Sequence, residues 1–426
     1  MEMYATPHAI GDYLDRPFTC PCGREHYAAL QFVSIRPGGI DDLRQRCCDA
    51  KSVLVVSDEN TFAAAGEATL AALEGKTIFR VTYPGDRLVV PNEEAVAAMD
   101  PYLDRVDAIV GIGSGVIQDI VKYGATGPHL PCHIVATAPS MDGYASTGAA
   151  MIMGGMKVTY PVDIPASIVA DTDVLRSAPM ELIRAGYGDI VGKFSALNDW
   201  KLSHLVKGEY FCQRVYDLMD AALQKTLSLA DGLVRRDGEA VNALMEALVL
   251  AGVAMSFAGS SRPASGSEHH LSHFFEITGI VDDTPYFMHG TDVAYSCVYT
   301  EKLREQLLTF DQAPENTPLS REAWEAEIRR IYTKVADEVI ALQDKVGWYK
   351  EDRRPIYAEK WQGIKEILSE VPTSEELTNY LRSIEMDVAE FEKLYGKEKI
   401  ENALKFGKDL KDRYSVLWMY YDLMVH

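Results

Sequence analysis

The sequence has few of the features that mark membrane, secreted or nucleic-acid-binding proteins. No stretch of its 426 residues approaches the ~20 apolar residues that span a bilayer, so we expect no membrane partner. The start of the chain, Met1 to Asp12, lacks the basic and apolar regions of a signal peptide. Seven cysteines is a small and odd number for this length, which predicts reduced thiols and a cytoplasmic location.

Positive charge is also scarce. Lysine and arginine total 42 against 63 aspartate and glutamate, for a formal charge of −21. Nucleic acids and anionic membranes need a basic surface, so we expect no nucleic-acid partner. A small anionic metabolite is still compatible, because a metal ion, a few cations or a helix N-terminus can bind it locally.

One cluster near the start of the chain suggests a metal. Cys20, Cys22 and His26, with Cys47 and Cys48 further on, resemble a small zinc site. The common Cys-x-x-Cys spacing is absent, so the sequence favours thiols without a metal.

Short β-branched runs alternate with helical stretches from about Lys51 to Asp173. Predicted strands cover 53–57, 77–82, 108–112 and 132–137, and an alanine-rich helix covers 61–73. This alternation is typical of a parallel sheet with helices on both faces.

The pattern becomes helical near Pro179, a residue that suits the first turn of a helix. Apolar residues recur at helical spacing over 180–206, 239–256, 321–345, 356–370 and 375–381. We predict an α/β domain over residues 1–175 and an all-helical domain over 176–426. The charged, tryptophan-containing stretch after about Glu301 favours amphipathic surface helices.

Three segments of the α/β part suggest a nucleotide. Glycines 111, 113 and 115 lie between a predicted strand and a helix, where the backbone can approach a diphosphate, although such turns occur in any α/β fold. Asp58 ends a strand and could bind a ribose diol or simply cap a helix. The order of these two features is the reverse of the usual Rossmann fingerprint. The polar segment 136–146 follows a strand, where ligands of parallel sheets bind, although its composition also suits turns.

Four of the ten histidines fall between residues 269 and 289. His269 and His273 are four apart and share a helical face, and His289 follows. Two histidines and a carboxylate form a common divalent-metal set with positions open for a substrate oxygen. Asp189 supplies a carboxylate beside two glycines that a helix would otherwise disfavour.

Taken together, these motifs resemble the sn-glycerol-1-phosphate dehydrogenase family, within the superfamily of iron-containing alcohol dehydrogenases, glycerol dehydrogenase and dehydroquinate synthase. The matching segments are 111–119, 137–146, 185–189, 265–269 and 289–290, within a region from about Lys51 to Tyr299. The resemblance implies a Rossmann-like domain, a helical domain and an active site in the cleft between them. It also implies NAD(P)H- and metal-dependent reduction of dihydroxyacetone phosphate to sn-glycerol 1-phosphate, a step of phospholipid metabolism.

The resemblance assigns roles to individual residues. Asp189, His269 and His289 match metal ligands, and Asp142 and His273 match catalytic residues. Asp142, Asp189 and His273 match substrate contacts, and Lys193 is a candidate for the substrate phosphate. The residues expected to contact the dinucleotide are Asp58, Gly113, Ser114, Gly115, Val116, Ile117, Gln118, Asp119, Thr137, Ala138, Pro139, Ser140 and Ser146.

Several alternatives stay open from the sequence. His270 has no counterpart in the family pattern. The four-residue spacing between His269 and His273 favours His269 over His270 as the ligand. Arg262 and Lys157 are further phosphate candidates, and either could equally be a solvated surface cation. The ion is expected to be zinc or nickel, while the proton donor, the choice between NAD and NADP and the formation of a homo-oligomer are undecided. A polyol dehydrogenase and a dehydroquinate synthase-like lyase are the rival functions.

Overall fold

The computed structural model describes residues 10–154 and 156–426. It divides into two compact units. One contains the chain up to Ile190 together with Asp217–Ser261, and the other contains Val191–Tyr216 and Arg262–His426. Every strand of the described residues ends by Asp171, and the regular structure beyond it is helical. This confirms the predicted fold class, while the domain boundary near residue 175 stays a prediction.

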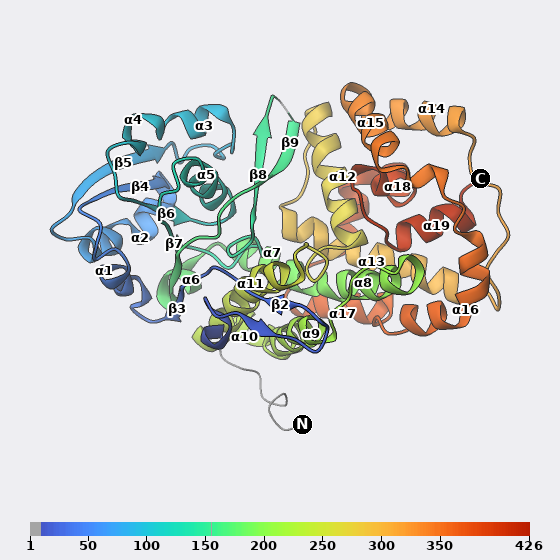
Figure 1. The fold of residues 1–426 in the computed structure, drawn as a ribbon, viewed down its shortest axis with the longest axis horizontal. Coiled ribbons are helices and arrows are strands. Elements are labelled where there is room, and N and C mark those ends of the chain that lie inside the picture. The colour runs from blue at the N-terminus through green and yellow to red at the C-terminus, as the bar shows by residue number, and fades with distance from the viewer. Residues whose placement is uncertain (1–9, 155) are drawn as a thin grey trace. The chain divides into compact units, whose positions relative to one another are not determined.

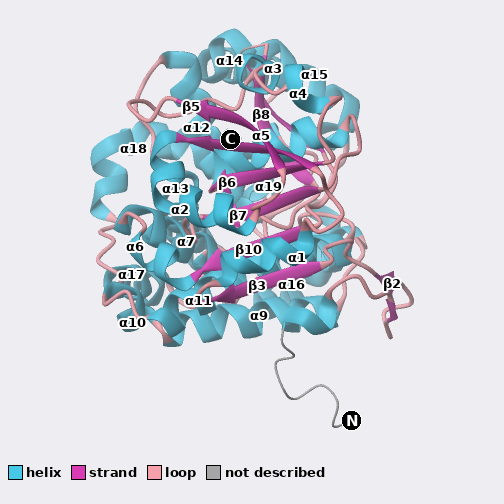
Figure 2. Ribbon diagram, turned by 90° about the vertical axis from the view of Figure 1, so that its left-hand side faces the viewer, coloured by secondary structure: helices cyan, strands magenta, loops and turns pink. Residues whose placement is uncertain are grey.

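The first unit is built on a six-stranded parallel sheet in the order β3-β10-β7-β6-β4-β5 (Figure 2). The four predicted strands correspond to β4, β5, β6 and β7, and β3 and β10 extend the sheet on the β7 side. The strands are β3 (Phe32–Arg36), β4 (Ser52–Asp58), β5 (Thr77–Tyr83), β6 (Ala108–Gly113), β7 (Cys132–Ala136) and β10 (Ser167–Asp171).

Helices cover both faces of this sheet because its strands are apolar on both sides. Side chains alternate between the faces of a strand. On one face Val53, Val55 and Val110 form a core with Ala65 of α2 (Glu59–Ala72). On the other face α5 (Gly115–Thr126) lies against β6 and β7.

The remaining elements of this unit are short strands and further helices (Figure 1). Two antiparallel hairpins pair β1 (Phe18–Thr19) with β2 (Glu25–His26) and β8 (Gly148–Met153) with β9 (Met156–Pro161). The helices are α1 (Leu43–Arg46), α3 (Glu93–Ala97), α4 (Asp100–Leu103), α6 (Thr172–Ser177), α7 (Met180–Val191), α9 (Gln213–Ser228), α10 (Ala230–Val234) and α11 (Gly238–Ala258).

Helix α11 is the most apolar of the long helices. By length and composition its 21 residues, with a mean hydropathy of 1.7, are sufficient to cross a membrane, which the sequence analysis did not anticipate. However, 78% of its most apolar window is buried inside the protein. The apolar character of α11 therefore serves the core.

The second unit is entirely helical in its described residues. Two stretches predicted as single helices are divided, one at Gly192 and one at Thr333, whose φ of 44° breaks the helix. Trp324 and Trp418 are 1% and 0% exposed. The helix of Trp418 is buried along most of its length and is not the amphipathic surface helix that the sequence favoured. The helices are α8 (Lys193–Lys207), α12 (Ser267–Asp282), α13 (His289–Leu308), α14 (Arg321–Tyr332), α15 (Ala336–Val346), α16 (Arg354–Leu368), α17 (Ser374–Ser383), α18 (Ala389–Phe406) and α19 (Val416–Met424).

Candidate active site

The glycines at the end of β6 are needed for packing. A Cβ on Gly111 would lie 2.5 Å from a methyl group of Val121. A Cβ on Gly113 would lie 2.6 Å from the Ile117 side chain. Both contacts are shorter than carbon atoms tolerate, so these glycines allow α5 to lie directly on β6. This is a physical reason for the motif that holds with or without a diphosphate.

The start of α5 has the properties of an anion site. The Ser114 side chain makes no capping hydrogen bond there, and Gln118 N donates to the Ser114 carbonyl at 3.0 Å. The preceding N–H groups have no partner within the helix and lie at the positive end of its dipole. Gly115, Val116 and Ile117 can therefore present backbone donors to a phosphate oxygen.

The two predicted nucleotide segments come together at the ends of adjacent strands. Thr137 N donates to the Gly113 carbonyl at 3.2 Å, so the loop over residues 137–146 begins beside the glycine turn. The register of β4 against β6 pairs Ser57 with Ile112, which brings Asp58 level with Gly113. Sequence alone did not give this strand order.

Asp58 itself caps α2. Its Oδ1 accepts a hydrogen bond from Thr61 N at 2.9 Å, and Thr61 Oγ1 accepts one from Asp58 N at 3.1 Å. This reciprocal capping box is the alternative role considered for Asp58 from sequence. Its contact with a ribose stays a prediction.

Lys122 is a buried cation that the sequence analysis missed. Its Nζ donates to the carbonyl oxygens of Gly143 and Gly148 at 2.9 and 2.7 Å and to Ser146 Oγ at 3.3 Å. It also lies 3.5 Å from a carboxylate oxygen of Asp119. Burial lowers the pKa of Lys122, and the negative charge of Asp119 opposes that shift. The sequence did contain a signal for this ion pair, because residues three apart, such as Asp119 and Lys122, lie on the same face of a helix.

Asp119 and Ser146 are thus held within the protein. The second carboxylate oxygen of Asp119 accepts from Ala150 N of β8 at 3.2 Å. Ser146 Oγ donates to the Gly143 carbonyl at 3.0 Å. The two residues fix the end of the 137–146 loop, and their contact with a dinucleotide stays a prediction.

The middle of the same loop is fixed by close backbone approach. The hydroxyl of Tyr144 donates to the Ala138 carbonyl at 2.6 Å, and burial raises the pKa of this phenol. A Cβ on Gly186 of α7 would lie only 1.9 Å from the Pro139 carbonyl oxygen. Gly186 is therefore required because the loop crosses the helix at this point. The sequence interpretation had instead attributed the glycine to a ligand.

The histidine group, which we define as His269, His273 and His289, lies in the second unit. Helix α12 carries the first two, and His289 is the first residue of α13. Ring centroids of His269 and His289 are 5.1 Å apart, and those of His273 and His289 are 5.8 Å apart. Three imidazoles thus lie close together. The sequence spacing had predicted that His269 and His273 share a helical face, and the family resemblance had added His289.

Side chains orient two of these rings. Glu268, fully buried, lies with Oε1 2.7 Å from His269 Nδ1 and also accepts from Gly266 N at 2.8 Å. Burial alone would raise the pKa of Glu268, but the hydrogen bond and charge of His269 hold it below the usual value. Ser272 Oγ lies 3.2 Å from His289 Nδ1. Both Nδ1 atoms are therefore engaged, and neither Glu268 nor Ser272 was predicted.

Asp189, His269 and His289 form a group that could hold a metal ion. Their candidate ligand atoms all lie within 4.8 Å of one another. Asp189 is fully buried, and one of its carboxylate oxygens accepts from Asp142 N at 2.9 Å. His270 is not in this group. Burial lowers the pKa of its imidazole well below the usual value, so it is a neutral ring of the interior.

The phosphate candidates differ in their surroundings. Arg262 donates to Glu209 Oε1 at 2.8 Å, to the Tyr414 carbonyl at 2.7 Å and to Ser203 Oγ at 3.0 Å, so it serves the interior of the second unit. Lys193 is fully buried and donates to the Ala264 carbonyl at 2.9 Å. The side chain of Lys157 lies outside the described residues.

Known proteins resemble this chain in sequence. A family model described as iron-containing alcohol dehydrogenase matches residues 35–179. A glycerol-1-phosphate dehydrogenase (NAD(P)+) of Halalkalibacterium halodurans is 31% identical over 313 residues, which cover 70% of this chain and 78% of that protein. The protein of the same description from Hyperthermus butylicus is 33% identical over 274 residues, covering 63% and 76%.

A solved structure resembles the fold. An archaeal alcohol dehydrogenase from a Red Sea brine pool matches with a TM-score of 0.59 and 14% identity, over 93% of this chain and 97% of that one. At this identity the similarity shows the fold alone.

Proposed function

The chain belongs to the glycerol-1-phosphate dehydrogenase family, and from this premise we propose that it reduces dihydroxyacetone phosphate to sn-glycerol 1-phosphate. The reductant is NAD(P)H, and one divalent metal ion, zinc or nickel, assists. The observation that carries the proposal is the convergence of Asp189, His269 and His289 within 4.8 Å. We expect the reaction in the cytoplasm, where thiols stay reduced.

The chemistry of the donors fits a divalent ion. A histidine that ligates through Nε2 commonly donates its Nδ1–H to a carboxylate or another acceptor, which fixes the ring. Glu268 and Ser272 occupy these positions for His269 and His289. With Asp189 as third ligand, the set leaves coordination positions open, as catalytic zinc sites do.

When bound, the ion would act as a Lewis acid on the substrate carbonyl oxygen and the nicotinamide would supply the hydride. The same oxygen must also receive one proton, from His273, from Asp142 or from a bound water. His273 lies beside His289, and the backbone N–H of Asp142 donates to Asp189. The positions of His273 and Asp142, next to proposed metal ligands, support a role for both residues in holding the substrate.

The loop region, which we define as residues 113–119 and 137–148, supports binding of the dinucleotide. The N–H groups that begin α5 suit its diphosphate, and the adjacent 137–146 loop contributes the polar Thr137 and Ser140, both 7% exposed. Asp58, level with Gly113, is proposed for the adenosine ribose. Lys193 is proposed for the substrate phosphate, as the sequence analysis expected. Its Nζ donates to the Ala264 carbonyl, which is neutral, whereas Arg262 donates to the Glu209 carboxylate.

The test is steady-state oxidation of NADH with dihydroxyacetone phosphate, after chelation and again after addition of zinc or nickel. We expect activity to disappear on chelation and to return with the ion. The product should be inert to a dehydrogenase specific for sn-glycerol 3-phosphate. Equal activity on dihydroxyacetone without phosphate would instead indicate a polyol dehydrogenase. A metal-dependent reaction without net NADH consumption on a lyase substrate would indicate a dehydroquinate synthase-like enzyme.

Variants sharpen this experiment. His269→Ala removes a proposed ligand, whereas His270→Leu replaces a neutral buried ring with an apolar side chain of similar size. We expect the first variant to lose activity and one bound ion while its circular dichroism is unchanged, and the second to keep both. Retention of activity and ion in His269→Ala would remove the basis of the proposed site.

A further inference from the structure

The hairpin of β1 and β2 gathers cysteines in a tight turn. Phe18 pairs with His26, and the turn between the strands contains Cys20, Pro21, Cys22 and Gly23. Within it, Gly23 N donates to the Cys20 carbonyl at 3.0 Å. Gly23 has a φ of 87°, in the left-handed region that glycine adopts without strain. The turn thus carries two thiols close to the histidine of the second strand.

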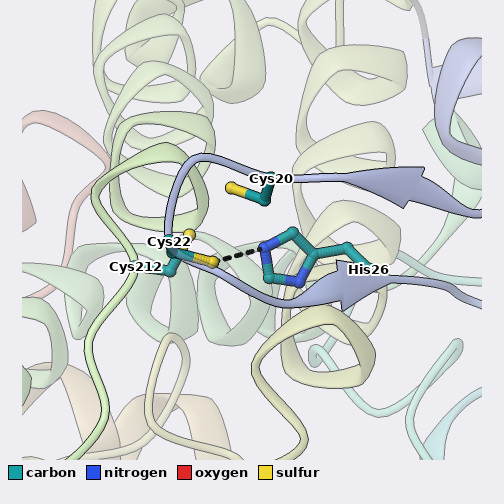
Figure 3. A group of neighbouring side chains, drawn as sticks. All are labelled: Cys20, Cys22, His26 and Cys212. Carbon is teal, nitrogen blue, oxygen red and sulfur yellow. Dashed lines mark hydrogen bonds between the residues drawn. The ribbon is translucent and has the colours of Figure 1, made fainter.

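His26 is oriented as a metal ligand. It is fully buried, and its Nδ1 lies 2.8 Å from the Phe257 carbonyl oxygen. A carbonyl can only accept, so Nδ1 carries the proton and Nε2 presents its lone pair. Nε2 lies 3.5 Å from Cys22 Sγ (Figure 3). A histidine held through Nδ1 by a backbone carbonyl is the usual arrangement behind a metal-binding Nε2.

A fourth ligand comes from Cys212, far away in the sequence. The Sγ atoms of Cys20, Cys22 and Cys212 and the His26 nitrogen all lie within 4.8 Å of one another (Figure 3). Zn–S bonds of about 2.3 Å and Zn–N bonds of about 2.0 Å place tetrahedral ligands roughly 3.5–3.8 Å apart. The distance of 3.5 Å between Cys22 and His26 is therefore that of a tetrahedron edge.

We propose that Cys20, Cys22, His26 and Cys212 bind one structural zinc ion, distinct from the ion proposed at Asp189, His269 and His289. Three sulfurs and one imidazole are a ligand set that favours zinc, and four protein ligands close its coordination. Cys20, His26 and Cys212 are buried, and Cys22 is half-buried, so bulk water has little access.

The place of the site in the fold indicates its role. The rings of Phe18 and His26 lie 5.2 and 5.6 Å from that of Phe257, near the end of α11. The iron-containing alcohol dehydrogenase family model matches only from residue 35, beyond the hairpin. The ion fastens this N-terminal hairpin, in which two-residue strands alone provide little stability.

The first test counts metal in the purified full chain by elemental analysis. We expect two equivalents of metal in the unaltered protein and one equivalent, of zinc, in His269→Ala. Adding Cys22→Ser to that variant should remove the remaining zinc, whereas adding Cys47→Ser, which replaces a thiol 2% exposed, should retain it. Comparing Cys22→Ser with Cys47→Ser in this background tests the cysteine site alone. If the proposed active site binds no metal, the zinc content expected of these two variants is unchanged.

A second measurement does not depend on the folding of a cysteine variant. Chelated His269→Ala is reconstituted with cobalt, and absorption in the near ultraviolet is recorded. Three thiolate ligands should give intense sulfur-to-cobalt charge-transfer bands, which an oxygen and nitrogen set lacks. A mercurial thiol reagent should release the ion as these bands vanish.

Two results would overturn the proposal. The first is that purified His269→Ala contains no zinc and also shows no charge-transfer absorption after reconstitution with cobalt. The other is a count of fewer than seven thiols in protein denatured with chelator and without reductant, which would indicate a disulfide in place of a metal.

Discussion

The loop region in the first unit and the histidine group in the second are held in place by different means. The loop is positioned through its backbone. Lys122 donates to carbonyl oxygens, Tyr144 donates to another, and Gly186 admits the Pro139 carbonyl. The histidines are positioned through side chains, namely the Glu268 carboxylate and the Ser272 hydroxyl.

This difference predicts different consequences of mutation. Removing a support of the loop leaves buried carbonyl groups without a donor or forces backbone atoms apart, so it should cost folding stability. Removing a side chain that orients a histidine leaves the helix intact but lets the imidazole ring rotate. We therefore expect it to lower the affinity for the metal ion. The first three experiments below test this contrast, from the largest expected effect to the smallest, and the fourth tests the pH dependence of the first unit.

Lys122→Met should destabilise the protein most. It keeps the apolar stem but leaves the Asp119 carboxylate and the carbonyls of Gly143 and Gly148 without their cation. Breaking a buried ion pair on one side costs about 3–5 kcal/mol, which urea unfolding can measure. Lys225→Met, in an exposed pair with Glu246, should cost at most about 1 kcal/mol. Equal small losses in both variants would show that the loop is not held by Lys122.

Gly186→Ala should destabilise, although alanine normally stabilises a helix by about 0.5–1 kcal/mol over glycine. The new methyl would lie 1.9 Å from the Pro139 carbonyl oxygen, so loop and helix must separate. We expect a loss of about 3 kcal/mol, seen as a lower Tm. Gly127→Ala is the matched control, since it has helical φ and nothing within 4 Å of the added carbon. A Tm raised in both variants would contradict the close approach.

Glu268→Gln should weaken metal binding with little change in unfolding. The amide keeps an acceptor for His269 but loses the charge that makes its ring a stronger ligand. Changes behind a metal-binding histidine typically cost about 10- to 100-fold in affinity. Titration of the chelated protein with nickel, against a competing chelator, measures this loss. Ser272→Ala should lower the nickel affinity less. Unchanged nickel affinity in Glu268→Gln would show that Glu268 does not position His269 for metal binding.

Acid should destabilise the sheet of the first unit through His133. Burial first, and the charge of Arg46 second, lower the pKa of His133 from 6.5 to about 4. The unfolded chain takes up a proton near pH 6.5, before the folded chain does. Stability from this residue is therefore complete above pH 6.5 and falls toward pH 4, by up to about 1.4 kcal/mol per pH unit.

His133→Gln should flatten this dependence in urea unfolding curves recorded between pH 4 and 7. His129→Gln is the control, because the His129 side chain is 82% exposed. Identical pH profiles for the unaltered protein and His133→Gln would assign the acid sensitivity to other groups.

The sequence predicted the order of elements where their patterns were strong. The strands β4, β6 and β7 are mainly apolar runs, β5 is rich in β-branched residues, and the helices of the second unit follow their apolar spacing. Helix ends were less predictable, since a single left-handed residue at Thr333 divides one helix without interrupting its apolar pattern. The supports of the site were also missed, because Lys122 and Glu268 look like ordinary surface charges until the fold buries them.

By itself, the sequence determined the fold class, the family and the candidate ligands Asp189, His269 and His289, because local periodicity and short motifs carry that information. Only the tertiary structure decided why Gly111, Gly113 and Gly186 are glycines, since the clashing atoms belong to other elements. It also decided that Cys212, and neither Cys47 nor Cys48, joins Cys20, Cys22 and His26. Sequence spacing cannot give such a partner, because a metal site requires proximity in space and the chain between its ligands can have any length.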